Sequence, residues 1–391
     1  MDDFVHIPKT SGSSLRTILA RQYGVNHISY YEPGNPQLQG RDAISALKED
    51  LSSREINLIT GHHAFGVHAA IHKPLRYFSM LRDPISRASS DYFFAYSYKH
   101  HRLRDEILSG SLTPEAFLID GRQAGRFDAQ CRLMSGRDVA APDIAGRAFE
   151  TIKRCFAVVG IAELFTESIL FMAKRLGWKP PLYVTRNVTR LAPEIERARG
   201  RIEEKVRAGF ADRYAADLRL HELAKAKLRQ DIQAEGAPFA RALEAFHEMQ
   251  AGIEKSNEAN KYDQYEFAAT DHLPDFAREI TGSEPYRVVQ DYLRAGDVSG
   301  PAPHNYVGHV DLVADQTVSG WAADLFRDEP IEVRVYQSGS QIGTAVARNE
   351  RPDVKSACDI RSNVGFTVHV DREITEKAEM RICFEDTSLI V

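Results

Sequence analysis

The sequence predicts an α/β protein with a helical extension and a C-terminal antiparallel β-sandwich. Three observations indicate this. Residues 1 to about 190 alternate short apolar runs with amphipathic stretches, which is typical of parallel strands joined by helices. Residues 194–260 carry apolar residues at steps of four among many charges, which indicates helix. After residue 304, short β-branched runs alternate with turn residues, as in a sandwich of antiparallel strands.

The composition is that of a folded protein with more than one domain. The chain has 391 residues, of which 43% are hydrophobic and 27% are charged, and this length predicts two or three domains. The formal net charge of −5 argues against a general nucleic-acid binder. No apolar run is long enough to span a membrane, and the first residues do not resemble a secretory signal. We therefore expect a cytoplasmic protein with reduced cysteines, namely Cys131, Cys155, Cys358 and Cys383.

Four short apolar runs in the first domain are predicted to be buried strands. They are FVHI (4–7), INLITGHH (56–63), YFSMLRD (77–83) and FAVVGIAE (156–163). Helices are predicted between them, for example over Ser13–Gln22 and Ile85–Tyr98. Active sites in such folds lie beyond the carboxyl ends of the strands. Residues that follow these runs are therefore the first candidates for a functional site.

The next segment is predicted to be helical. One face of it is formed by Ile202, Val206, Phe210, Tyr214 and Leu218. Gly209 is predicted to divide it into two helices. We expect these helices to pack on the sheet domain; the alternative is an arm that joins copies of the chain in a homo-oligomer.

A segment rich in Gly, Ser and Pro (296–305) has the composition of a linker. The strands expected after it are YVGHVDLV, VSGWAAD, IEVRVYQ, SQIGTAVAR, VGFTVHV and MRICFE. The predicted domains are therefore residues 1–235, 236–303 and 304–391. The last of these shows no catalytic group of residues, and binding of a glycan or a partner is suggested for it by association alone.

The loop after the first predicted strand has the features of an anion site. Its candidate ligands are Lys9, Thr10, Ser11, Gly12, Ser13 and Ser14. Unpaired N–H groups and the helix dipole attract anions to the start of a helix. In the GxxxxGK[ST] loop of nucleotide triphosphatases the lysine follows the glycine, whereas here it precedes it. The cradle is predicted to be P-loop-like but not specific for ATP; a capped helix with a surface lysine is the alternative.

A second candidate anion site follows the strand at 77–83. Arg82 lies just after the strand, Pro84 can begin a helix, and Ser90 lies two turns into that helix. An arginine and a serine so placed can hold a phosphate, the arginine through two hydrogen bonds. An ion-paired helix start, in which Arg87 binds Asp83 or Asp91, is the alternative. Two anion sites on consecutive strand ends predict a ligand with two separated phosphates.

The two motifs resemble those of a known family. HIPKTSGSSL resembles the 5′-phosphosulfate loop of the sulfotransferases, and LRDPISRASSDY resembles their 3′-phosphate motif. Three weaker matches are FDAQCRLMSG (127–136), FAVVGIAELFTESI (156–169) and YAADLRLHELA (214–224). The resemblance covers about residues 4–235 and is strongest to the carbohydrate branch, which contains the heparan-sulfate 2-O-sulfotransferases and bacterial relatives.

This resemblance implies a reaction. The co-substrate would be 3′-phosphoadenosine-5′-phosphosulfate (PAPS), without a metal, and the acceptor a hydroxyl of a carbohydrate or glycolipid. The loop departs from the family pattern at Ser11, which stands where the first of two glycines is usual. Serine accepts a positive φ poorly, so either this position does not need one or the loop is altered.

Sulfuryl transfer requires a base for the acceptor hydroxyl and a cation beside the leaving oxygen. Lys9 is placed for the second role. The resemblance puts the catalytic histidine at His62, with His63 as the second candidate; a structural role is the alternative for both. Arg186 and Thr189 are expected to close over the 3′-phosphate, with a solvated loop as the alternative.

Two other functions stay open from the sequence. One is a non-catalytic glycan-binding protein on the same fold. The other is a P-loop phosphotransferase, which should show a lysine after the loop glycine and an acidic magnesium ligand after a strand. Neither feature is evident in the sequence.

Overall fold

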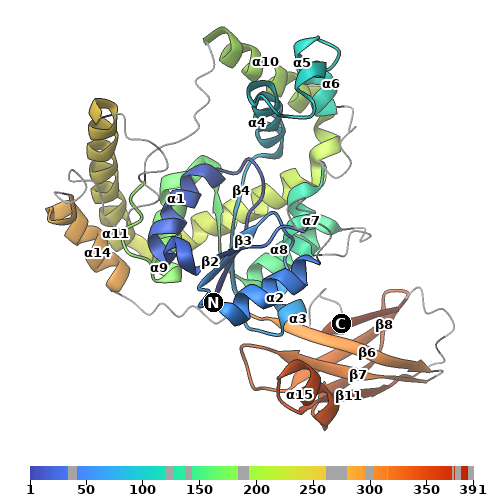
Figure 1. Ribbon diagram of the computed structural model, residues 1–391. Helices are drawn as coiled ribbons and strands as arrows, with labels where there is room; N and C mark the ends of the chain where they lie inside the picture. Colours follow the sequence, from blue (N-terminus) through green and yellow to red (C-terminus); the bar gives the residue numbers. More distant parts are fainter. Residues whose placement is uncertain are drawn as a thin grey trace.

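The structure is a computed structural model in which two regions of different architecture are joined (Figure 1). It describes residues 1–33, 42–119, 127–136, 143–183, 193–260, 280–295, 303–314, 316–371, 374 and 380–385. Within these ranges, no helix combines the length and the apolar composition needed to cross a membrane. All four cysteines are among the described residues and are free thiols.

A five-stranded parallel sheet forms the centre of the first region. Its strands are β1 (Asp2–Val5), β2 (Ile28–Tyr30), β3 (Leu58–Gly61), β4 (Arg76–Leu81) and β5 (Phe156–Ile161), in the order β2-β3-β1-β4-β5. Phe4 of β1 lies opposite Thr60 of β3 and Phe78 of β4, so all strands run in the same direction. The four predicted strands are therefore confirmed, while β2 was not predicted because its three residues carry too little periodicity.

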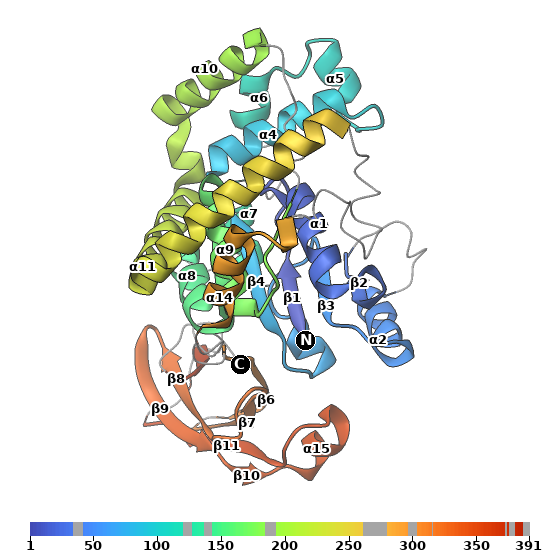
Figure 2. The ribbon, with the colours of Figure 1, turned by 90° about the vertical axis from the view of Figure 1, so that its left-hand side faces the viewer.

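Helices flank the sheet and extend above its carboxyl edge (Figures 1 and 2). The first part of the chain contains α1 (Gly12–Tyr23), η1 (Val25–His27), α2 (Ala43–Ser53), α3 (Val67–Ile71), α4 (Pro84–Ser97), α5 (Arg104–Leu108), α6 (Pro114–Ile119), α7 (Ala129–Ser135), α8 (Ile144–Cys155), η3 (Ala162–Leu164) and α9 (Phe165–Leu176). The helical segment contains α10 (Pro193–Phe210), η4 (Ala211–Tyr214), α11 (Ala215–Asn260) and α14 (Glu284–Arg294).

The helical segment packs on the first region. The break predicted at Gly209 occurs one residue later, where α10 ends. Val206 and Tyr214 are fully buried in a hydrophobic cluster shared with α4, α5 and α6, so this face covers the helices above the sheet (Figure 2). α11 has a kink at Gly236, and residues of α11 on both sides of this kink join the hydrophobic core of the sheet itself, as do residues of α14.

Two antiparallel sheets make up the C-terminal region. One contains β6 (Tyr306–Ala314), β7 (Thr317–Asp324), β10 (Asn349–Glu350) and β11 (Asn363–His369), and the other β8 (Ile331–Gln337), β9 (Ser340–Ala347) and β12 (Met380–Phe384). A short helix, α15 (Pro352–Cys358), precedes β11. Val318, Val333 and Phe366 come from both sheets and share one buried core. The six predicted strands are confirmed as antiparallel strands.

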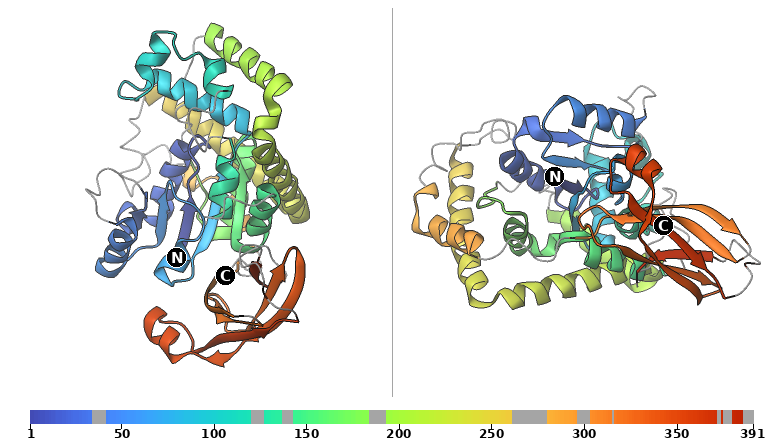
Figure 3. Two further views of the ribbon diagram at one scale, coloured as in Figure 1. Left: turned by 90° about the vertical axis from the view of Figure 1, so that its right-hand side faces the viewer. Right: turned by 90° about the horizontal axis from the view of Figure 1, so that it is seen from below.

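The C-terminal sheets contact the amino edge of the parallel sheet (Figures 1 and 3). The side-chain oxygen of Asn305 accepts a hydrogen bond from the backbone of Leu75, just before β4. The backbone of His304 donates to the carbonyl of Arg154, just before β5. The carboxyl ends of the strands point the other way, toward α4 and α10. The antiparallel sheets are therefore remote from the edge at which the candidate residues lie.

Candidate functional site

Every strand of the parallel sheet is followed by a polar group at its carboxyl end. In the spatial order of the strands these are Glu32, His62, the loop Ile7–Ser14, Arg82 and Glu163. The loop follows the central strand β1. His62 and Arg82 follow the two neighbouring strands, one on each side of the loop. The carboxyl edge therefore brings together the groups that the sequence analysis placed on separate strands.

The loop after β1 presents backbone amides. Lys9 and Ser11 have positive φ values of 69° and 68°, and α1 begins directly afterwards at Gly12. The first amides of a helix have no intrahelical partners, and here the Ser11 side chain does not cap them. Thr10 is fully buried and its hydroxyl donates to the carbonyl of Ile7 at 2.8 Å. The Thr10 hydroxyl thus braces the loop, while the amides of the first turn are the groups able to bind an anion.

The structure shows whether position 11 of the loop needs a positive φ. The position does adopt the left-handed conformation for which glycine is preferred, and serine occupies it. Gly12 is needed for a different reason, because a Cβ atom there would lie 1.9 Å from Nε2 of His6. The loop therefore contains one strained serine and one glycine that leaves room for a histidine ring.

Lys9 lies between the loop and α4. Its ammonium nitrogen is 4.1 Å from the centre of the Phe94 ring, a cation–π contact. Burial lowers the pKa of Lys9; nearby Asp91 raises it, and the cations Arg82 and Arg199 lower it further. The lysine thus belongs to a cluster of positive charges, which favours an anionic ligand at this position.

Arg82 connects the two predicted anion sites. Its guanidinium donates to the carbonyl of Lys9 at 3.1 Å, and Gln130 bonds to both its backbone N–H and its carbonyl. Burial lowers its pKa, and Arg199 adds to this effect. Ser90 is half-buried on α4, one turn before Phe94, and therefore on the same helix face as the ring beneath Lys9. The structure thus joins Arg82 to Lys9 and places Ser90 on the helix face that carries Phe94.

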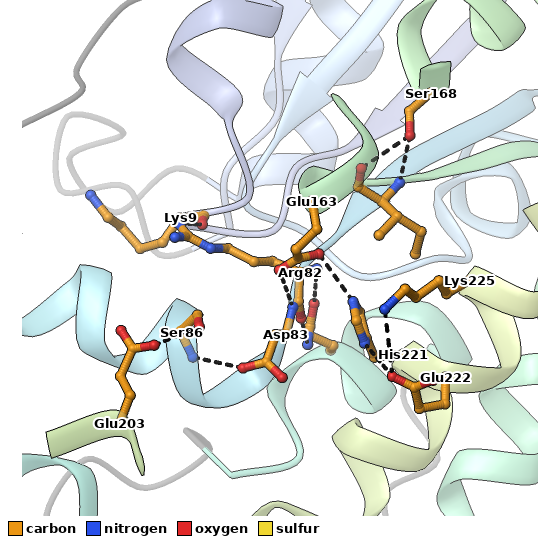
Figure 4. Close-up of polar contacts among 12 residues, drawn as sticks. Lys9, Arg82, Asp83, Ser86, Glu163, Ser168, Glu203, His221, Glu222 and Lys225 are labelled. Atoms are coloured by element: carbon orange, nitrogen blue, oxygen red, sulfur yellow. Dashed lines mark hydrogen bonds and ion pairs between the residues drawn. The ribbon is translucent and has the colours of Figure 1, made fainter. Parts of the chain in front are cut away.

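Ion pairs and hydrogen bonds fix the start of α4, and Figure 4 shows those that involve Asp83, Glu163 and His221. Asp83 caps the helix and binds Arg207 through two hydrogen bonds of 2.9 and 3.0 Å. Its backbone N–H donates to Glu163, whose other oxygen is 3.1 Å from His221. Although burial raises the pKa of Asp83, Arg207 holds it below its ordinary value. This network positions Arg82. The sequence did not reveal it, because Arg207 is one of many charged residues in the helical segment.

His62 is held by a carboxylate. Its Nδ1 lies 2.8 Å from Oε1 of Glu32, and the two side chains are 43% and 44% exposed. Gly61 allows this approach, because a Cβ atom there would lie 2.0 Å from the carbonyl of Tyr31. With Nδ1 bonded to the carboxylate, Nε2 is the nitrogen left to accept a proton. Sequence reasoning missed Glu32, because it follows the strand that was not predicted.

His63 faces the opposite side of the chain and does not join the site. It is 2% exposed, its Nδ1 donates to the carbonyl of Ala64, and its Nε2 is 3.2 Å from Oδ1 of Asp3. Burial lowers the pKa of His63, but the Asp3 carboxylate more than offsets this and the net direction is upward. Its place is therefore that of a buried structural residue, as consecutive residues of an extended chain point to opposite sides.

The remaining predictions concern two further ligand residues and the absence of a metal. Arg186 and Thr189 lie outside the described residues. Among those that are described, no group of three or more His, Cys, Asp or Glu side chains is arranged to hold a metal ion. A hollow of about 320 Å³ opens between β2 and α2, with Tyr30, Glu32 and Glu49 in its lining.

No protein-family model and no curated protein sequence matches the chain.

Proposed function

We propose that the protein is a P-loop-like sulfotransferase that moves a sulfuryl group from PAPS to a carbohydrate hydroxyl. One observation carries the proposal. An amide-lined, cationic loop follows the central strand, with an oriented histidine on one side and an arginine on the other. The chemistry needs an anion cradle, a proton acceptor and a second cationic site in one place.

Each group has a role in this reaction. The amides at the start of α1 and Lys9 bind the 5′-phosphosulfate, and Arg82 with Ser90 binds the 3′-phosphate. His62 accepts the proton of the acceptor hydroxyl, while Glu32 orients its ring. Since β2 is the edge strand next to β3, the acceptor approaches His62 from the side of the hollow beside Glu32.

Nucleotide binding gives the first test. Adenosine 3′,5′-bisphosphate should raise the melting temperature, and ATP with magnesium should raise it much less, because the two anion sites are separated. Equal stabilisation by both nucleotides would favour a phosphotransferase instead. Incubation with labelled PAPS and a panel of glycans then tests transfer. Binding of a glycan without any transfer would favour a non-catalytic glycan-binding protein.

A further inference from the structure

His6 occupies a position that neither motif explains. It directly follows β1, and its backbone N–H donates to the carbonyl of Gly61 at 3.1 Å. Its ring stacks on Phe4 at 5.4 Å and lies 4.8 Å from the ring of His62. The same ring covers Gly12, where it fills the space that a side chain would need. His6 therefore stands between the first turn of α1 and the candidate base.

Packing holds the ring of His6 in place, and its two ring nitrogens are available to bind another partner. It is only half-buried, and neither ring nitrogen bonds to another of the described residues. Burial lowers its pKa to about 3, with further contributions from His62, Arg16, His63 and Lys9. The ring is thus neutral at physiological pH and carries one N–H donor and one lone pair.

A neutral donor at this point suits one part of the reaction. The sulfur must lie between the oxygen bound at the loop and the acceptor oxygen beside His62, and that is the space next to His6. During transfer, negative charge must be stabilised on the oxygens of the sulfuryl group as well as on the leaving phosphate. Lys9, whose ammonium group contacts the Phe94 ring of α4, is the cation assigned to the leaving phosphate.

We infer that His6 is a further catalytic residue, which donates a hydrogen bond from its ring N–H to a non-bridging oxygen of the transferred sulfuryl group. This inference rests on the proposed function. The acceptor oxygen bonds to sulfur while the bond from sulfur to the phosphate oxygen breaks. The electron pair of that bond stays on the phosphate, and the acceptor proton goes to His62. His6 neither gains nor loses a proton.

The contact can be tested without knowing the acceptor, because PAPS carries the sulfuryl group and adenosine 3′,5′-bisphosphate does not. His6→Ala should weaken PAPS binding by about tenfold, the effect of one hydrogen bond to a charged group, and leave bisphosphate binding nearly unchanged. His6→Gln keeps a neutral N–H donor and should recover most of the loss. His27→Gln, at a partly exposed histidine in η1 that lies outside the proposed site, serves as the control and should change neither affinity.

The outcomes separate this inference from the function on which it rests. If wild-type protein binds neither nucleotide, the proposed function fails and His6 loses its role with it. If wild-type protein binds both, but His6→Ala weakens both equally or neither, the function stands and the inference is overturned. Melting temperatures decide whether the alanine variant is folded. Should it unfold, the glutamine variant decides alone, since equal weakening of both nucleotides in it would indicate a packing role only.

Discussion

Two polar residues at the amino edge of the parallel sheet, Asp2 and Asn305, differ in their hydrogen bonding from the loop amides and His62 at the carboxyl edge. At the amino edge, the carboxylate of Asp2 accepts two hydrogen bonds from Arg76 and one from the hydroxyl of Tyr23. Asn305, fully buried, joins the C-terminal sheets to the start of β4. At the carboxyl edge, the amides at the start of α1 and the half-exposed His62 have hydrogen-bonding atoms that are available to a ligand.

This difference agrees with a site at the carboxyl edge, as proposed above. Saturated polar groups stabilise a junction, since a buried donor without a partner is costly. Open polar groups and backbone strain, as at Lys9 and Ser11, are tolerated where a ligand is bound. The contacts at the amino edge join parts of the fold, and the proposed function places binding and chemistry at the carboxyl edge. Each variant below is expected to affect one edge and to spare the other.

The largest effect is expected at His62. If its ring removes the acceptor proton, His62→Ala should lower turnover by roughly 10²–10⁴, the usual contribution of a general base, with bisphosphate affinity and melting temperature nearly unchanged. Glu32→Gln should lower turnover less, because the base remains and only its orientation suffers. His27→Ala is the control for loss of a partly exposed histidine outside the proposed site. Retention of more than about a tenth of wild-type turnover in His62→Ala would contradict the role of a base.

The two ends of β4 provide a matched pair of arginines. Arg82→Ala should raise the dissociation constant for adenosine 3′,5′-bisphosphate at least about tenfold, because a hydrogen bond to a charged group contributes roughly 1.5–3 kcal/mol. Arg76→Ala removes a cation at the amino end of the same strand and leaves the carboxylate of Asp2 without it. This variant should lose stability and keep its nucleotide affinity. Calorimetry and chemical denaturation of both variants test the comparison, and unchanged binding in Arg82→Ala would remove the 3′-phosphate assignment.

The amino edge should respond to acid through His68. Its Nε2 donates to the carbonyl of Tyr306, its Nδ1 faces the hydroxyl of Tyr77, and burial lowers its pKa to about 4. Between pH 6.5 and 4 the unfolded chain therefore binds a proton that the folded chain does not. Stability should fall with pH in this window, by about 1.4 kcal/mol per pH unit from this residue.

Two variants isolate this contribution. His68→Gln should lower the dependence of the unfolding free energy on pH between 4.5 and 6. Asn305→Ala breaks the same junction without removing a titratable group, so it should lower stability by about 1–3 kcal/mol and keep the wild-type slope. Chemical denaturation at several pH values measures both. Identical slopes in all three proteins would show that His68 is not the group responsible.

The sequence predicted the parts of the fold that depend on local periodicity. Apolar periodicity marks the longer strands, the face of the helical segment and the six C-terminal strands. In the structure, packing buries the apolar residues of these elements. The site was harder, because its geometry depends on contacts between distant residues. Glu32 follows a strand of three residues, and Arg199 of α10 acts on the pKa of Lys9 from a distant part of the chain. His6 and His63 show that a residue type alone does not tell whether a histidine faces a ligand or the core.

The smallest expected effect concerns the strained serine of the loop. Ser11 is left-handed, which costs a non-glycine residue about 1–2 kcal/mol, while glycine costs about 0.5–1 kcal/mol in backbone entropy. Ser11→Gly should therefore raise the unfolding free energy by somewhat less than about 1 kcal/mol. Asp359→Gly, at an exposed left-handed residue after α15, should give a similar gain far from the site. If the amides rather than the Ser11 hydroxyl bind the anion, neither variant should change the affinity for bisphosphate. A tenfold loss in Ser11→Gly alone would make the hydroxyl a ligand, and a loss of stability in it would show that the serine stabilises the loop conformation by a contact of its own.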